Sequence, residues 1–328
     1  MKFRFASFNM KNMGETAKTQ RDFDTVANII RNEHFDVVAF QEILSEGKSL
    51  EYWVRKTLPR WELRWAEPGE SSDPSKTKDK RGEGYAFIWN TRRLTLASSV
   101  TIKGNRIFEP RIVNEDIRYK ASLFARTPYY ARFVPVNGGF FEFRLVNVHL
   151  HFGDNTKSEI EKRKEEFDFL VQNVYPALSL ERRYGNNRTA YTIVMGDYNL
   201  NLRKDRGEAE KRINPNTYID AFVPVKKQII ATVQDELTTL KSNYTDEPTQ
   251  DDNPSRGYSQ NYDHFSFDTQ VFESDGIRYR ARRIDAVRKY YNDQFDSYRV
   301  NISDHLPICL ELTINEPEEL NHAKRNRH

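Results

Sequence analysis

A chain of 328 residues, 38% of them hydrophobic and 13% aromatic, can bury a sizeable core, which excludes wholesale disorder. Lysine and arginine number 51 against 48 aspartate and glutamate, and the resulting net charge of +3 does not by itself identify a nucleic-acid binder. The single cysteine, Cys309, excludes an intramolecular disulfide and a thiolate metal cluster. No apolar run has the length of a membrane span and the N-terminus lacks a secretory pattern, so a cytoplasmic protein is expected; a signal removed beforehand would leave no trace.

The predicted elements mix strands and helices along the whole chain. Short runs rich in β-branched and aromatic residues predict strands at Phe3–Phe8, Val37–Phe40, Tyr85–Trp89, Phe141–Val148, Tyr191–Met195, Phe265–Phe267 and Pro307–Leu312. Helical spacing predicts one helix through Phe23, Val26, Ile29 and Ile30 and a longer one through Ile160, Phe167, Leu170, Val171 and Val174. With no Pro/Gly-rich linker at mid-chain, we expect one α/β domain over residues 1–315 and a polar tail over 316–328. Two polar stretches, Pro68–Arg81 and Thr245–Gln260, predict loops.

Polar side chains suited to metal or acid–base chemistry follow several of the predicted strands. Asn9 ends the first strand and Glu42 follows the second. A carboxylate at a rigid strand end suits Mg²⁺, which takes oxygen donors and few protein carboxylates. Glu42 alone is equally consistent with a solvated charge or a helix cap.

Two further strands end in histidine or in aspartate and asparagine. His149 and His151 face the same side of their strand, so one can be catalytic while the other packs, or both can bind zinc. Zinc is the weaker interpretation, because it usually takes three or four nitrogen or sulfur ligands. Gly196 permits a close backbone approach beside Asp197 and Asn199, although an Asx turn that simply ends the strand explains the same residues.

The last strand begins after Asp304 and His305, which place a carboxylate beside an imidazole. Upstream, Asp263 offers a second carboxylate that can hold a histidine in one tautomer. Each motif has a structural explanation of its own. Their joint occurrence at strand ends predicts an active site.

The ordered set of motifs resembles one superfamily of phosphoesterases over almost the whole chain. The motifs are Ser7-Phe8-Asn9, Gln41-Glu42, Gly196-Asp197-Tyr198-Asn199 and Ser303-Asp304-His305-Leu306-Pro307. In this order they resemble the endonuclease/exonuclease/phosphatase superfamily. The resemblance implies a four-layer α/β sandwich, two packed mixed β-sheets flanked by helices. It also implies a hydrolase that uses Mg²⁺ or Mn²⁺, with Ca²⁺ as an alternative.

The resemblance also implies roles for the metal-side residues. Asn9, Glu42 and Asp304 match the ligands or near-ligands of the principal metal. Asp197 and Asn199 match the pair that contacts the scissile phosphate and orients the attacking water, or a second metal. Which group acts as the general base stays open.

The two active-site imidazoles of the superfamily are matched by His149 and His305, and Asp263 matches the carboxylate that orients His305. In the deoxyribonuclease branch a glutamate pairs with the first histidine. Glu83 resembles this glutamate by position, which implies that it is the partner of His149. Arg126, within Phe-x-Arg-x-Pro, resembles that branch's arginine, which touches the phosphate backbone.

That branch predicts an endonuclease acting on DNA, with RNA left open. Two departures argue against the secreted mammalian context. Leu44 stands where the branch has arginine, and its structural disulfide is impossible with one cysteine. The alternatives are a phosphomonoesterase, a sphingomyelinase-type lipid phosphodiesterase, or a binding module with a decayed site. The last is disfavoured because the candidate catalytic residues are all present, and no long aromatic segment suggests membrane entry.

Two basic stretches are candidate polyanion contacts. The first comprises Lys103, Arg106, Arg111, Arg118, Lys120 and Arg126, and the second is Arg278–Arg283. Solvated faces balanced by nearby carboxylates explain either stretch equally well.

Overall fold

The computed structural model describes residues 1–16, 18–66, 83–101, 104–107, 109–113, 124–138, 141–154, 156–179, 189–201, 222–225, 228–234, 236–242 and 257–314. The predicted loop at 68–81, most of the one at 245–260 and the predicted tail lie outside these residues.

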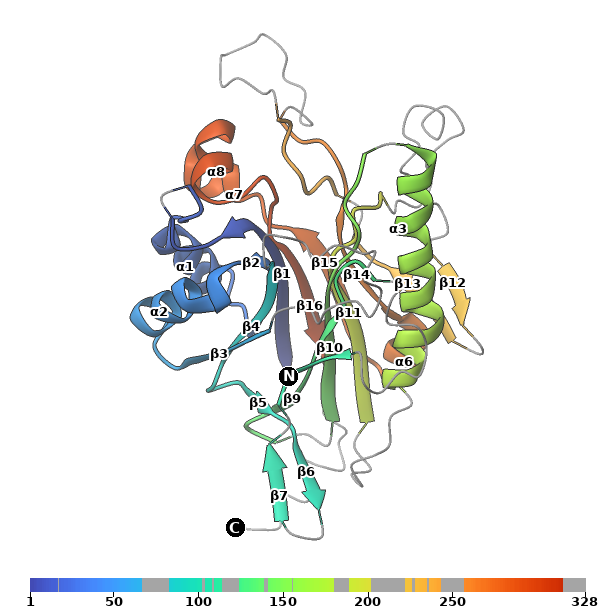
Figure 1. Cartoon of the computed structure of the whole chain (residues 1–328). Helices are drawn as coiled ribbons and strands as arrows, with labels where there is room; N and C mark the ends of the chain where they lie inside the picture. The colour runs from blue at the N-terminus through green and yellow to red at the C-terminus, as the bar shows by residue number, and fades with distance from the viewer. Residues whose placement is uncertain are drawn as a thin grey trace.

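Two mixed β-sheets pack against each other in the centre of the molecule (Figure 1). The first has the order β15 (Arg278–Arg283), β16 (Ile308–Thr313), β1 (Lys2–Met13), β2 (Val37–Ile43), β4 (Gly84–Asn90), β3 (Trp61–Ala66). The second has the order β12 (Phe222–Val225), β13 (Gln228–Thr232), β14 (Asp263–Asp268), β11 (Thr189–Asp197), β10 (Phe141–His149), β9 (Tyr129–Pro135), β5 (Leu94–Leu96), with β8 (Arg111–Ile112) paired to β9. The strands β6 (Ser98–Thr101) and β7 (Gly104–Ile107) form a separate hairpin.

Each sheet contains one parallel pair, β1 with β2 and β10 with β11, among antiparallel neighbours. Parallel strands begin at the same edge of a sheet and therefore end at the same edge. The ends of these two pairs carry the candidate residues.

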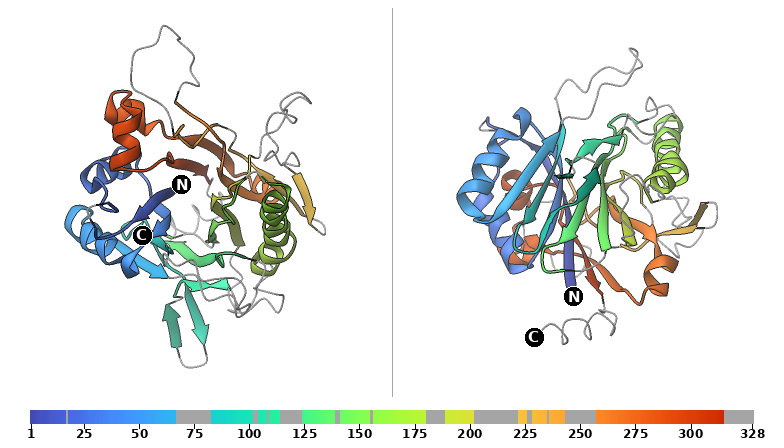
Figure 2. Two further views of the ribbon diagram at one scale, coloured as in Figure 1. Left: turned by 45° about the horizontal axis from the view of Figure 1, so that its top comes forward. Right: turned by 90° about the horizontal axis from the view of Figure 1, so that it is seen from below.

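Helices cover the outer face of each sheet (Figures 1 and 2). Beside the first sheet lie α1 (Phe23–Asn32), the 3₁₀ turn Ser45–Gly47, α2 (Lys48–Thr57), α7 (Ala286–Tyr291) and α8 (Phe295–Asn301). Beside the second lie α3 (Lys157–Phe169), a π-helical segment (Leu170–Val174) and α4 (Tyr175–Ser179). The short helix α6 (Thr269–Ser274) follows β14 and packs Phe272 into the core between the sheets. This arrangement confirms the predicted four-layer sandwich. None of the described helices combines the length and apolarity that a membrane crossing requires.

Strand β1 shows why the sequence forms these layers. Phe3 and Phe5 point into the core between the sheets, where Phe5 contacts Phe143 of β10 with ring centroids 4.7 Å apart. Ala6 and Phe8 point to the opposite face and pack in the cluster that includes α1 and α2. Apolar side chains on both faces thus attach the strand to two separate cores, although Arg4, Ser7 and Asn9 interrupt its apolar sequence.

Candidate active site at the strand ends

The candidate residues of both sheets meet at one end of the sandwich. His149 and Asp197 end the parallel strands β10 and β11 and are register partners. Asp263 begins the antiparallel strand β14, directly opposite Asp197. Asn9, in β1 of the other sheet, donates a hydrogen bond from Nδ2 to Asp197 Oδ2 at 3.0 Å. The fold therefore brings these four predicted residues together, three of them from strand ends and Asn9 from within β1.

The last residues of β11 require glycine, and the residues that follow form the turn that the sequence also suggested. Gly196 has φ of 151°, and a Cβ added there would lie 2.0 Å from the carbonyl oxygen of Val148. Asp197 Oδ1 accepts the backbone N–H of Asn199 at 2.9 Å, which is the Asx turn. Asp197 Oδ2 is directed toward the other candidate residues. The amide of Asn199 donates to the carbonyl of Leu150 at 3.0 Å, so it fixes the neighbouring strand end.

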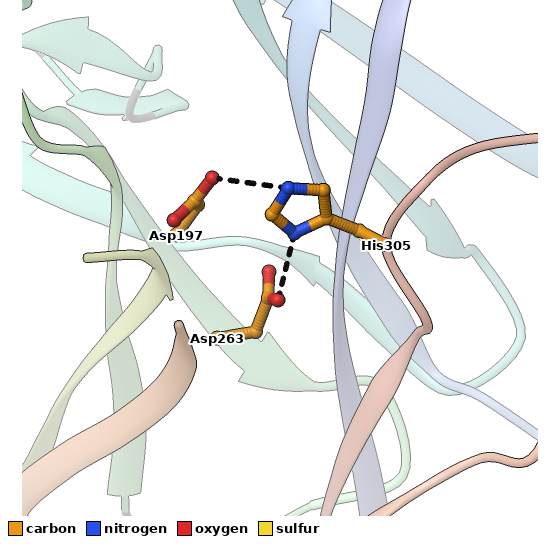
Figure 3. A group of neighbouring side chains, drawn as sticks. All are labelled: Asp197, Asp263 and His305. Carbon is orange, nitrogen blue, oxygen red and sulfur yellow. Dashed lines mark hydrogen bonds and ion pairs between the residues drawn. The ribbon is translucent and has the colours of Figure 1, made fainter. Parts of the chain in front are cut away.

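His305 lies between two buried aspartates (Figure 3). Its Nδ1 is 2.8 Å from Asp263 Oδ2, and its Nε2 is 3.6 Å from Asp197 Oδ2. Asp263 is fully buried and Asp197 is 1% exposed. The predicted orientation of His305 by Asp263 agrees with this contact.

Burial and charge shift the pKa values of this group in opposite directions. Burial, reinforced by the Asp263 carboxylate and opposed by His305, raises the pKa of Asp197 to about 7. Burial alone would lower the pKa of His305, but the Asp263 and Asp197 carboxylates hold it well above its ordinary value. Shifts of this kind, in a cluster of titratable groups, are typical of acid–base sites.

Glu42 enters the site through an irregularity in β2. Its φ is 58°, and the pairing of β2 with β4 shifts register between Phe40 and Ile43. A bulge of this kind re-aims a side chain at the cost of local backbone strain. Glu42 accepts hydrogen bonds from Asn9 Nδ2 at 2.8 Å and from the backbone N–H of Asn12 at 2.9 Å. Burial and the charge of Glu83 raise the pKa of Glu42.

His149 is surrounded by three carboxylates. Its Nε2 lies 3.7 Å from Asp197 Oδ2 and 3.8 Å from Glu42 Oε1, and its Nδ1 lies 3.7 Å from Glu83 Oε2. The expected neighbour Glu83 is therefore present, at a distance longer than a hydrogen bond. Glu83 Oε2 is closer to Arg126, whose Nη2 is 2.8 Å away. Arg126 is thus part of the site through Glu83, and its side chain is only 12% exposed.

Asp304 lies apart from the buried carboxylates. Its side chain is 40% exposed and forms an ion pair of 3.4 Å with Lys11. Its charge still contributes to the raised pKa of Glu42. Among the three expected metal ligands, Asn9 and Glu42 share a hydrogen bond and Asp304 stands at the exposed rim.

The two remaining histidines near the site make structural contacts. His151 pairs through Nε2 with Glu159 of α3. His264 is fully buried, and its Nε2 lies 2.9 Å from the carbonyl oxygen of Leu200 and 2.8 Å from that of Asn261, while its Nδ1 lies 3.2 Å from that of Gln234. Burial lowers the pKa of His264.

The basic stretch Arg278–Arg283 forms the edge strand β15. Arg282 bonds Glu33 at 2.7 Å, and Arg283 lies over the ring of Tyr258 at 4.1 Å. Both side chains are occupied by internal contacts, which agrees with the alternative that this stretch is a face balanced by nearby carboxylates. Arg278 and Arg280 are exposed. In the other stretch, Lys103, Arg118, Lys120 and the side chain of Arg106 lie outside the described residues.

Two buried charges of α3 support the site and were not predicted. Arg163 donates to the carbonyls of Asn199 at 3.3 Å and Gly153 at 3.0 Å. Glu166 accepts two backbone N–H groups from segments beside the site. Both side chains fall on the apolar face of the predicted helix. A charge at such a position is the sequence signal for a buried ionic contact.

The oxygen-rich donor set suits a hard divalent cation. Ligand atoms of Asp197, Asp263 and His305 all lie within 4.8 Å of one another. Asp263 Oδ1 is buried and has no hydrogen-bond partner among the described residues. Glu42 and Glu83 add negative charge close by, as the raised pKa of Glu42 shows. Carboxylates crowded in this way favour Mg²⁺ or a similar ion over zinc.

Comparisons with known proteins identify the architecture. No protein-family model matches the sequence, and the search of curated proteins also found no match. Solved structures do match over nearly the full length. An endonuclease/exonuclease/phosphatase family protein from Bacteroides thetaiotaomicron has a TM-score of 0.54, 18% identity and 96% coverage of each chain.

Two further structural neighbours have more specific names. TDP2 from D. rerio, complexed with a single-strand DNA product, has a TM-score of 0.54 and 14% identity, covering 95% of this chain and 99% of that one. A mannosyl-6-phosphatase from Bacteroides thetaiotaomicron VPI-5482 has a TM-score of 0.52 and 16% identity, covering 95% and 100%. This chain therefore has the fold of the endonuclease/exonuclease/phosphatase proteins.

Proposed function

We propose that this protein is a metal-dependent phosphodiester hydrolase, a nuclease that cleaves DNA. The observation that carries the proposal is the convergence on Asp197 Oδ2 of Asn9 at 3.0 Å, His305 at 3.6 Å and His149 at 3.7 Å. These groups come from both sheets and supply a carboxylate, an amide and two imidazoles at one point. The structural likeness to TDP2 bound to a DNA product supports nucleic acid as the substrate class.

The metal would be held by carboxylates at the strand ends. Asn9 and Glu42 are the proposed ligands on the first sheet, with Asp304 reaching in from the rim. Asp197, Asp263 and His305 form an alternative group, which would require a neutral His305 and therefore excludes the proton-transfer roles proposed below for these residues. When bound, Mg²⁺ or Mn²⁺ supplies Lewis-acid stabilisation of negative charge on a phosphate oxygen.

The protein's own residues would divide the proton transfers between them. Asp197, with a pKa raised to about 7, has a suitable basicity to take a proton from an attacking water near neutral pH. His305, whose pKa lies well above its ordinary value, would remain protonated and donate a hydrogen bond to the phosphate. Asp263 would keep the His305 ring in place through their 2.8 Å contact. His149, whose Nε2 lies 3.7 Å from Asp197 Oδ2, would stabilise negative charge beside the same carboxylate.

A phosphomonoesterase is the second candidate, and two observations favour it. The mannosyl-6-phosphatase matches this chain over 95% of its length. In addition, Arg126, the proposed backbone contact, pairs with Glu83 and is only 12% exposed. A small phosphate ester needs no extended basic groove, whereas a polynucleotide does.

The test is hydrolysis of defined substrates by the purified protein in Mg²⁺. Supercoiled plasmid, linear DNA, RNA and mannose 6-phosphate are incubated in parallel with wild type and with Asp197→Asn. A nuclease nicks the plasmid, and the variant lowers its kcat by about two orders of magnitude or more. Asp268→Asn, a buried carboxylate at the far end of β14, is the matched control and should retain activity. If only mannose 6-phosphate is hydrolysed, the protein is a phosphomonoesterase and the nuclease proposal is wrong. If no substrate is hydrolysed, both proposals are rejected.

A further inference from the structure

Glu166 is a buried carboxylate on α3, 3% exposed, on the helix face that packs against the second sheet. Its Oε1 accepts the backbone N–H of Ala125 at 2.5 Å, and its Oε2 accepts the backbone N–H of His151 at 2.6 Å. One side chain therefore holds two segments that are far apart in the sequence.

Each of these segments carries a residue of the candidate site. Ala125 directly precedes Arg126, and His151 follows His149 by two residues along the extension of β10. Arg126 lies 2.8 Å from Glu83, and Glu83 lies 3.7 Å from His149. These contacts form a closed ring. On one side, Glu166 bonds Ala125, whose neighbour Arg126 pairs with Glu83. On the other, Glu83 lies near His149, and His151 bonds Glu166 again.

The helix itself is fixed to the segment that follows Asp197. Arg163, one turn before Glu166 and 1% exposed, donates to the carbonyl oxygens of Asn199 and Gly153. The carboxylate of Glu166 is consequently held by a rigid element rather than by a loop. Rigid support of this kind is what keeps catalytic groups in a productive geometry.

We propose that Glu166 is a positioning residue that sets Arg126 and His149 relative to each other through this ring. The proposal rests on the proposed function, because it assigns Arg126 to substrate binding. Loss of the Oε1 acceptor would release the segment of Ala125 and let the Arg126 guanidinium move away from Glu83, and loss of Oε2 would release the segment of His151. A displacement of about 1 Å at such a group lowers kcat/KM by up to roughly a hundredfold.

The experiment is a double-mutant cycle on DNA hydrolysis with Glu166→Gln, Arg126→Ala and the double variant. Glu166→Gln should raise KM for DNA roughly tenfold, and in the Arg126→Ala background it should add almost nothing. Glu165→Gln, an exposed neighbour on the same helix, is the control and should match wild type. A general loss of structure would lower activity in both backgrounds equally, so additive effects would overturn the proposal.

A second readout needs no activity. The guanidinium Nε–H resonance of Arg126, identified by its loss in Arg126→Ala, should shift in Glu166→Gln and stay in place in Glu165→Gln. An unchanged resonance in Glu166→Gln would overturn the positioning role, whatever the activity. If the wild type hydrolyses no substrate, the proposed function is rejected. The Arg126 resonance still tests whether Glu166 positions Arg126, because it does not depend on activity. If Glu166→Gln does not fold, Glu166→Asp replaces it, since the shorter carboxylate cannot hold both amides.

Discussion

Replacing Asp263 by asparagine tests the central electrostatic contact of the site. The side chain is fully buried, and its Oδ2 lies 2.8 Å from Nδ1 of His305. The substitution keeps the shape of the side chain and removes its charge. Because Asp263 is the strongest of the charges that raise the pKa of His305, the imidazole should lose its proton at a lower pH in the variant.

The size of the effect follows from the separation of the two groups. At 2.8 Å, Coulomb's law gives about 1.5 kcal/mol with the dielectric constant of water and about 6 kcal/mol with an effective value of about 20. Removing the Asp263 charge should therefore lower the pKa of His305 from its raised position in the wild type. A histidine whose pKa is raised by folding stabilises the folded state fully at a pH below its pKa in the unfolded chain, which is about 6.5. The free energy of unfolding lost in Asp263→Asn should therefore be largest below about pH 6.5. The loss should shrink as the pH rises through the pKa of His305 in the folded wild type.

The measurement is an NMR titration of the His305 ring in EDTA, for wild type and for Asp263→Asn. Asp268→Asn is the control, because Asp268 is buried on the same strand and caps α6, where asparagine is an equally good cap. The control should leave the His305 titration unchanged. A pKa in Asp263→Asn equal to or above the wild-type value would refute the electrostatic reasoning. In the activity assay, the same variant should lower kcat by about a hundredfold or more.

Four further outcomes are expected. EDTA should abolish turnover and Mg²⁺ or Mn²⁺ should restore it, with Glu42→Gln requiring more metal for half-maximal rate; full activity in excess EDTA would contradict metal dependence. His149→Ala should lower kcat by about two orders of magnitude and His151→Ala much less, and the reverse order would show that the wrong histidine was assigned. Arg126→Ala should raise KM for DNA and flatten its salt dependence, because phosphate contacts release counterions, so an unaltered salt slope would remove Arg126 from substrate binding. Gly196→Ala should lower the free energy of unfolding by about 3 kcal/mol in urea titrations, since the new Cβ meets a backbone carbonyl at 2.0 Å; a wild-type midpoint would show that the turn relaxes easily.

The sequence predicts the centre of the fold well because the central strands are buried on both faces. All seven predicted strands are present, and both predicted helices form. His149 and Asp197 end such strands and Asn9 lies within β1, so the sequence places these three candidate residues on the central strands, while their roles stay a prediction. Their mutual approach follows from the parallel pairing within each sheet.

Strands at or near the edges of the sheets escape prediction because their sequences carry charge. Strand β15 alternates arginine with Tyr279 and Ala281, which pack toward the core between the sheets. Strand β9 contains the buried Arg132, paired with Glu142 of β10. In both strands, charged side chains obscure the apolar alternation that identifies a strand. The partner of Arg282, Glu33, lies far away in the chain, and that of Arg132, Glu142, lies on the next strand, so only the pairing of strands and sheets brings these charges together.

The pairing of Arg126 with Glu83 is also a tertiary effect that the motifs do not contain. The sequence resemblance assigns Glu83 to His149 and Arg126 to the substrate as two separate contacts. In the folded chain the same carboxylate lies near both groups, at 2.8 Å from the guanidinium and 3.7 Å from the imidazole. A substrate phosphate that attracted Arg126 would therefore change the charge that His149 experiences.

The position of the site between the two sheets explains why polar residues extend deep beneath it. The amide of Gln41 in β2 donates to Ser7 Oγ at 3.0 Å and to Asn147 Oδ1 of β10 at 2.7 Å, while Asn147 donates to the carbonyl of Phe40 at 2.9 Å. Apolar side chains would fill this space, but they allow sliding between sheets, whereas directional hydrogen bonds fix one relative position. Asn9 and Asp197 come from different sheets and meet at 3.0 Å, so a shift of the sheets by even one ångström would separate them. The buried amides below the site thus set the distance on which the proposed chemistry depends.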